Sequence, residues 1–178
     1  MNWKTGAGLA MCLAATVSFA AGEAAGGVTW TAPKSWEAQP ARQMRAATYK
    51  TPAAKGDSEG AELAVFYFGE GQGGAVDPNI QRWIGQFTQA DGTPSSARAK
   101  QKKETVAGFV TSRVEVTGTY ASGGMGMGPP TNKPDFELLG AIVEGPKGSV
   151  FFKLIGPKKT VEGARKDFQA LLKSLKKE

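Results

Sequence analysis

The fold is most constrained by the stretch Glu62-Leu63-Ala64-Val65-Phe66-Tyr67-Phe68. Successive side chains of a β-strand point to opposite faces of the sheet. This segment therefore has apolar side chains on both faces, with Leu63, Val65 and Tyr67 on one and Ala64, Phe66 and Phe68 on the other. Because both faces must be covered, the segment predicts a central strand.

The next patterned segment predicts a helix. Asp77 is typical of a helix N-cap and Pro78 of the first helical position. Apolar residues then recur at the spacing i, i+3, i+4 and i+7, namely Ile80, Trp83, Ile84 and Phe87. We expect an amphipathic helix of about three turns whose apolar stripe lies on the sheet.

Working outward, further strands are expected over residues 28–31, 43–49, 98–106, 110–120, 136–144 and 149–155. Residues 33–36 predict a turn ending on Trp36, and residues 145–148 predict the turn of an antiparallel hairpin. Residues 122–134 are expected to form a loop. A closing amphipathic helix follows, with Thr160 as its cap and Lys173, Lys176 and Lys177 at its C-terminal end.

This order lacks the alternation that parallel βαβ units require. It predicts an α+β fold made of a single antiparallel β-sheet flanked by α-helices, an α/β/α sandwich. Residues 28–178 are expected to form one domain, and the small residues 21–27 before it a flexible leader.

Residues 1–20 have the features of a secretory signal peptide. Lys4 precedes an apolar run over residues 6–17, and Ser18-Phe19-Ala20 has the small-x-small pattern of a cleavage site. The run is short for a membrane anchor, which needs about 20 residues. Lipidation at Cys12 is a second alternative, but Met11 stands where a lipobox has a small residue. We therefore expect an exported protein, periplasmic or extracellular, without a transmembrane segment or a cysteine in its mature chain.

The element order resembles the PsbP-type fold over residues 28–175. The resemblance rests on the turn Pro33–Trp36, on the helix start Asn79-Ile80-Gln81-Arg82-Trp83 and on Gly156-Pro157. That family includes extrinsic photosystem proteins and many exported bacterial proteins of unassigned role. The resemblance implies a non-catalytic accessory protein that docks on a larger envelope assembly, and it implies no catalytic residue.

The residue content disfavours catalysis. The chain has no histidine, which removes the commonest general base and metal ligand. Residues 69–74 fit the spacing G-x-G-x-x-G, but the expected helix starts too late for a dinucleotide fingerprint. We expect no catalytic residue, no bound metal and no cofactor.

Three features suggest binding surfaces. Basic residues at Arg42, Arg45, Arg98, Lys100, Lys102 and Lys103 could attract anionic lipid or polysaccharide, and the chain carries a net charge of +6. Aromatic residues are absent from residues 88–108, which argues against nucleic acid. Met125 and Met127 lie in a Gly-rich loop that could contact a partner or, less favourably, Cu(I), because two thioethers are too few for a tight site. Asn79 and Arg82 are expected to be exposed beside the Gly-rich loop at residues 69–74.

The sequence therefore favours an exported, non-catalytic accessory or binding protein of the cell envelope. It would contact a protein partner through the loops at residues 69–79 and 122–134, with Asn79, Arg82, Met125 and Met127 as contact residues. The alternative is a small-ligand carrier or an enzyme with a pocket between sheet and helix.

Overall fold

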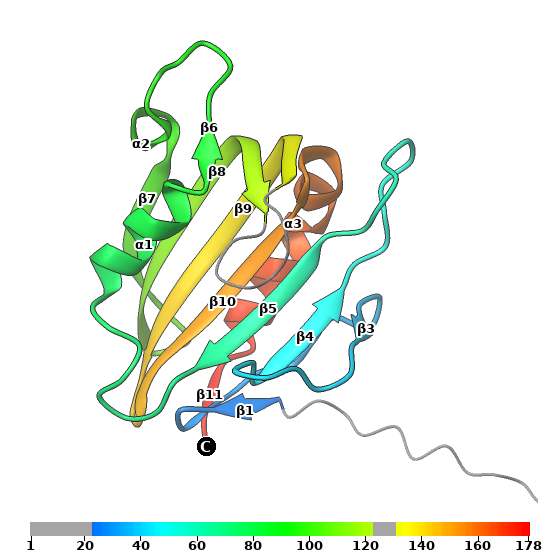
Figure 1. Ribbon diagram of the computed structural model, residues 1–178. Helices are drawn as coiled ribbons and strands as arrows, with labels where there is room; N and C mark the ends of the chain where they lie inside the picture. The colour runs from blue at the N-terminus through cyan, green and yellow to red at the C-terminus, as the bar shows by residue number, and fades with distance from the viewer. Residues whose placement is uncertain (1–22, 123–130) are drawn as a thin grey trace, which may run out of the picture.

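The computed structural model describes residues 23–122 and 131–178 (Figure 1). These residues form two antiparallel sheets and three helices. The large sheet has the order β3-β4-β5-β10-β9-β8-β6, and β7 also pairs with β8. Its strands are β3 (Glu37–Ala38), β4 (Ala47–Lys50), β5 (Glu62–Tyr67), β6 (Phe87–Thr88), β7 (Lys100–Val106), β8 (Phe109–Ser122), β9 (Thr131–Gly145) and β10 (Gly148–Pro157).

The small sheet joins the two ends of the described chain. It contains β1 (Ala24–Ala25), β2 (Val28–Thr29) and β11 (Lys176–Lys177), in the order β1-β2-β11. The prediction of a single sheet is therefore wrong. The prediction of a flexible leader over residues 21–27 is also wrong from residue 23 onward. Strand β1 pairs with β2, and the turn residues Gly26 and Gly27 are buried. The expected signal peptide at residues 1–20 lies outside the described residues.

The helices lie on opposite faces of the large sheet (Figure 1). On one face α3 (Lys158–Lys173) packs Phe168, Leu171 and Leu172 against the sheet. On the other, α1 (Val76–Ile84) buries the predicted stripe, which is confirmed. Phe87 belongs to β6 rather than to the helix, because α1 ends at Ile84 with Gly85 as its C-cap.

The central position of β5 is confirmed. It lies between β4 and β10, where Leu63 is paired with both Tyr49 and Leu154. The hairpin of β9 and β10 is confirmed as well, with the turn at residues 146–147. A third, short helix, α2 (Ser95–Arg98), takes Arg98 out of the expected strand.

The predicted helix caps are wrong. The N-cap of α1 is Ala75, and Asp77 lies within the first turn. Thr160 also lies inside the first turn of its helix, α3. Its backbone N–H and hydroxyl donate to Oδ2 of Asp57 at 3.0 and 2.5 Å. A carboxylate from a distant loop thus satisfies a donor that a local cap would otherwise bond.

The expected loop at residues 122–134 is shorter in the structure. Ser122 belongs to β8 and residues 131–134 belong to β9. The rest of that loop, with Met125 and Met127, lies outside the described residues. No helix in the described part of the chain is long and apolar enough to cross a membrane.

Candidate functional site

The end of β5 leaves an aromatic side chain open to solvent. Phe68 follows β5 and is 40% exposed. Its ring stacks on Phe66 at a centroid distance of 6.1 Å and meets Phe151 edge-on at 5.5 Å. The prediction that Phe68 is covered is wrong, because the chain leaves the sheet after Tyr67 and α1 packs mainly over β8 and β9.

The Gly-rich segment at residues 69–74 is folded against these rings. Gly73 has a φ of 90°, and a Cβ atom on it would stand 3.0 Å from Phe68 and from Phe151. Glycine is therefore needed at this position both for the backbone conformation and for the close approach. Gly74 also has a positive φ and lies outside α1.

Asn79 holds this segment in place from within α1. Its side chain is buried, and Nδ2 donates to the carbonyl oxygens of Gly73 and Ala75, both at 2.8 Å. The prediction that Asn79 is exposed is wrong, because its amide satisfies two loop carbonyls. Arg82, one turn further along the helix, is exposed. Its role in partner contact stays a prediction.

A second exposed apolar side chain lies at the same end of the sheet. Met44 is 68% exposed and has a φ of 64°. The backbone N–H of Ala46 donates to the carbonyl of Val65 at 2.8 Å, so this turn runs beside the end of β5. A non-glycine residue in the left-handed region costs about 1–3 kcal/mol. We call Met44, Phe68 and residues 69–74 the loop-end surface.

The basic residues noted in the sequence do not form one patch. Arg42 and Arg45 lie near β4 and both bind Glu62, at 3.2 and 2.6 Å. The others lie at the opposite edge of the sheet, around β7. There Arg98, Lys102 and Lys103 lie within ion-pair distance of Asp91, Glu104 and Glu144. Five of the six cations thus have a carboxylate partner.

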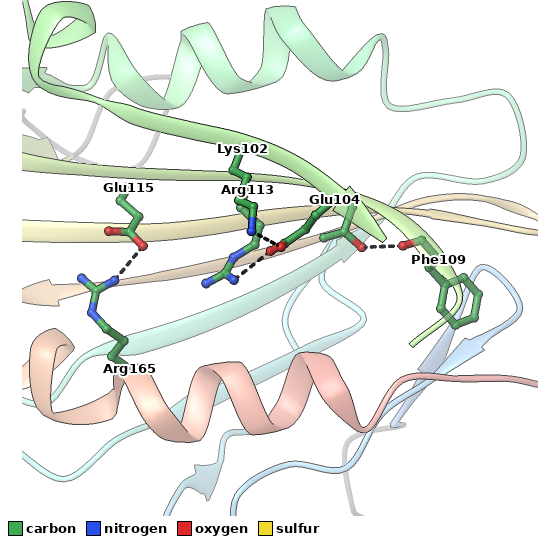
Figure 2. Close-up of polar contacts among 7 residues, drawn as sticks. Lys102, Glu104, Phe109, Arg113, Glu115 and Arg165 are labelled. Carbon is green, nitrogen blue, oxygen red and sulfur yellow. Dashed lines mark hydrogen bonds and ion pairs between the residues drawn. The ribbon is translucent and has the colours of Figure 1, made fainter. Parts of the chain in front are cut away.

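A surface groove lies between the hairpin of β7 and β8 and the C-terminal half of α3 (Figure 2). Its volume is about 400 Å³, and it is lined by Glu104, Thr105, Val106, Ala107, Arg113, Gln169, Leu172 and Lys173. Figure 2 shows Glu104 accepting from Lys102 at 2.5 Å and from Arg113 at 3.0 Å. These two bonds hold the pKa of Glu104 below its usual range. Glu104 and Arg113, two of the three charged residues that line the groove, are therefore already paired with each other.

A second charged cluster lies nearer the N-terminal end of α3. Arg165 donates to Glu115 at 2.7 Å, as Figure 2 shows, and to Glu137 at 2.5 Å. Glu137 is 3% exposed, and its Oε2 atom has no hydrogen-bond partner among the described residues. Burial raises the pKa of Glu137, although Arg165 acts in the opposite direction. The sequence reasoning missed this cluster, because Glu137 lies within a strand that is otherwise largely apolar.

Residues 23–122 and 131–178 contain no group of three or more Asp, Glu, Cys or His side chains that could hold a metal ion. Met125 and Met127 lie outside these ranges. Partner contact and copper binding at those two residues both stay predictions.

No protein-family model and no curated protein matches the sequence. Several solved structures are similar to the chain, among them the following two, each at 10% sequence identity. A crystal structure from Bacteroides thetaiotaomicron VPI-5482 has a TM-score of 0.48 and matches 89% of this chain, which spans about half (49%) of that protein. The solution structure of cyanobacterial PsbP from Synechocystis sp. PCC 6803 has a TM-score of 0.49 and matches 86% of this chain and 88% of the other. At these values neither neighbour assigns a family or an activity to this chain.

Proposed function

We propose that this chain is an exported, non-catalytic accessory or binding protein of the cell envelope, of the PsbP-like type, and that it contacts a protein partner through the loop-end surface. One observation carries the proposal. Among the described residues, three large apolar side chains are exposed: Met44, Phe68 and Val110. Met44 and Phe68 lie on neighbouring segments at the end of β5, whereas Val110 lies on β8, which β9 and β10 separate from β5. Apolar side chains that gather on a surface mark interaction sites.

The conformation of this surface also supports a binding role. Residues 69–74 are fixed by the contacts of Gly73 with two aromatic rings and by the bonds of Asn79. A surface that is ordered before binding loses less conformational entropy when a partner docks. Met44 projects its exposed side chain from the hydrogen-bonded turn at residues 42–45, in which it takes the positive φ.

A protein partner fits better than an anionic lipid or polysaccharide. Attraction to an anionic surface needs cations that are free of carboxylates. Near the loop-end surface, Arg42 and Arg45 both bind Glu62. Within the loop-end surface the one charged residue is the exposed, acidic Glu70, so the recognition chemistry here is mainly apolar and aromatic.

The groove between the β7–β8 hairpin and α3 supports the alternative of a small-ligand carrier or enzyme, because its volume of about 400 Å³ is sufficient for a small molecule. We place it second, since Glu104 and Arg113 bond one another across its wall. A ligand would have to replace those bonds.

Site-specific photo-cross-linking in the producing cells tests the proposal. A benzoylphenylalanine in place of Phe68 or, in a second variant, of Met44 should give a discrete protein adduct. The matched control carries the same group in place of Val110, which is exposed to a similar extent, 39% against 40%, on β8. Equal adducts from both positions, or none from Phe68 and Met44, would contradict the proposal.

A further inference from the structure

Strand β7 forms an open edge of the large sheet, on the side opposite to β3 (Figure 1). It is seven residues long, and within the described part of the chain it pairs only with β8. Alternate residues of an edge strand turn their backbone N–H and C=O groups away from the sheet. Among the described residues, no backbone group bonds to these outward groups of β7. The strand can therefore accept a further strand along its whole length.

The side chains of β7 are mostly basic and exposed. The strand contains Lys100, Lys102 and Lys103 and one acid, Glu104. Among the described residues, no carboxylate lies within ion-pair distance of Lys100. Lys102 and Lys103 do have carboxylate partners, but their side chains are 68% and 67% exposed, and exposed ion pairs contribute little to stability. These lysines can therefore turn to the carboxylates of an incoming segment.

The charge of β7 also disfavours other occupants. Lysines on an edge strand oppose pairing with a strand that leaves their charge unbalanced. A second copy of β7 would be such a strand, because each copy has more lysines than acids and like charges on paired strands are destabilising. A segment that supplies carboxylates balances the charge and is favoured.

The groove between the β7–β8 hairpin and α3 adjoins this edge. Paired residues of neighbouring strands share a face of the sheet. Val106 is paired with Phe109, whose side chain belongs to the apolar core that α3 covers. Every second residue of β7 therefore faces α3, as Figure 2 shows for Lys102 and Glu104. Val106 and Leu172 form the apolar part of the groove lining, so the groove offers an apolar side chain a place beside the end of β7.

We propose that the β7 edge binds an extended, acidic segment of another protein as an additional antiparallel strand. Main-chain hydrogen bonds to β7 hold the segment, and its side chains determine which segment is chosen. An apolar residue opposite Val106 lies against the groove, and Asp or Glu residues lie opposite the three lysines of β7. The pair of Glu104 and Arg113 stays intact, because the added strand bonds to the outer edge.

This inference goes beyond the proposed function. Strands β8, β9 and β10 separate β7 from β5, at whose end the loop-end surface lies. The two surfaces can therefore be occupied at the same time, and either one can be tested without the other.

A short peptide tests the β7 edge. The probe is fluorescein-labelled Leu-Thr-Thr-Glu-Glu-Val-Glu, and its binding to the whole protein is followed by fluorescence polarisation at about 50 mM salt, where surface charges are weakly screened. In the antiparallel register its leucine lies opposite Val106 and its glutamates opposite Lys103, Lys102 and Lys100. We expect saturable binding, and binding at least about tenfold weaker for Leu-Thr-Thr-Lys-Lys-Val-Lys. Absence of saturable binding, or equal affinity of the two peptides, would overturn the proposal.

Methylation of the peptide backbone distinguishes strand addition from simple charge attraction. One version of the probe carries N-methyl groups at its odd positions and a second version at its even positions. Only one of these sets of N–H groups points at β7 in an added strand. One version should therefore bind at least about tenfold more weakly than the probe, and the other should stay within about threefold. Equal affinities of the two versions would refute strand addition.

Two double variants of the protein keep the test specific. Lys100→Gln with Lys103→Gln should weaken binding of the probe by about fivefold or more. Lys34→Gln with Lys50→Gln removes the same charge from exposed lysines elsewhere and should leave binding unchanged. Equal effects of the two double variants would overturn the proposal. Sedimentation velocity of the protein alone tests the other occupant: a dimer that the probe dissociates would assign the edge to a second copy of the chain and would also overturn it.

Discussion

Replacement of Gly140 by alanine tests how the core beneath α1 is packed. Gly140 lies on β9 directly under Trp83. A Cβ atom on Gly140 would stand 2.6 Å from Cζ3 of Trp83 and 2.7 Å from Cγ1 of Val114. Carbon atoms in contact prefer about 3.5–4.0 Å. The indole ring must therefore move by about 1 Å, and it is buried and in contact with the Phe151 ring at a centroid distance of 6.4 Å.

Overpacking of this kind costs about 1–3 kcal/mol. In a domain of this size each kcal/mol lowers the melting temperature by about 2–4 °C, so we expect a decrease of about 2–12 °C for Gly140→Ala. Trp83→Ala alone should cost about 3–5 kcal/mol, the usual range for a buried tryptophan. In the double variant the clash with Trp83 is absent and only that with Val114 remains, so it should be more stable than the sum of the two single effects predicts.

The assays are thermal and urea unfolding, both followed by far-ultraviolet circular dichroism, because Trp83→Ala removes a fluorophore. An unchanged melting temperature for Gly140→Ala, or strictly additive effects in the double variant, would show that Trp83 does not lie against Gly140. An unchanged melting temperature for Trp83→Ala would mean that Trp83 is exposed and would revive a surface role for it.

Three further predictions concern charge, processing and the loop outside the described residues. Burial raises the pKa of Glu137, so ionisation of this carboxyl lowers the stability of the fold as the pH rises above about 4.5. Glu137→Gln should therefore have a higher melting temperature than the wild type at pH 7.5, and the difference should close toward pH 4. A lower melting temperature of the variant at pH 7.5 would refute this. N-terminal sequencing of exported material should begin near Ala21, whereas an intact Met1 on the mature protein would exclude cleavage. Changing both Met125 and Met127 to serine should leave the melting temperature within about 1 °C and should weaken partner capture or copper binding. Loss of folding would refute the prediction on stability. Unchanged partner capture together with unchanged copper binding would refute the prediction on function.

The elements that could be predicted from the sequence are those specified by local pattern. Strand β5 has apolar side chains at consecutive positions, and the stripe of α1 follows the helical period. The turn between β9 and β10 contains Pro146 followed shortly by Gly148. In each case the signal and the structure lie within a few residues of each other in the chain.

The elements that could not be predicted depend on residues far apart in the chain. The small sheet pairs β2 with β11, each only two residues long, so neither has a readable period. Asp57 bonds to the first turn of α3 from 103 residues away. Nothing in the sequence around the first turn of α3 indicates that its hydrogen-bond acceptor comes from Asp57.

The candidate sites show the same division. Phe68 fits the alternation of β5, and only the point where the chain leaves the sheet exposes it. Asn79 carries a polar side chain at the start of a surface helix, and its burial follows from loop carbonyls that the sequence does not locate.

The central claim is that Met44 and Phe68 contact a protein partner, and affinity measurements on the cross-linked partner test it most directly. The purified partner would be titrated with the wild type, with the double variant Met44→Ser and Phe68→Ser, and with Val110→Ser as the matched control. Apolar residues at the centre of an interface each contribute about 1–2 kcal/mol or more. We predict at least a tenfold loss of affinity, about 1.4 kcal/mol, for the double variant and no change for Val110→Ser. Equal affinities for all three proteins, with unchanged melting temperatures, would contradict the claim.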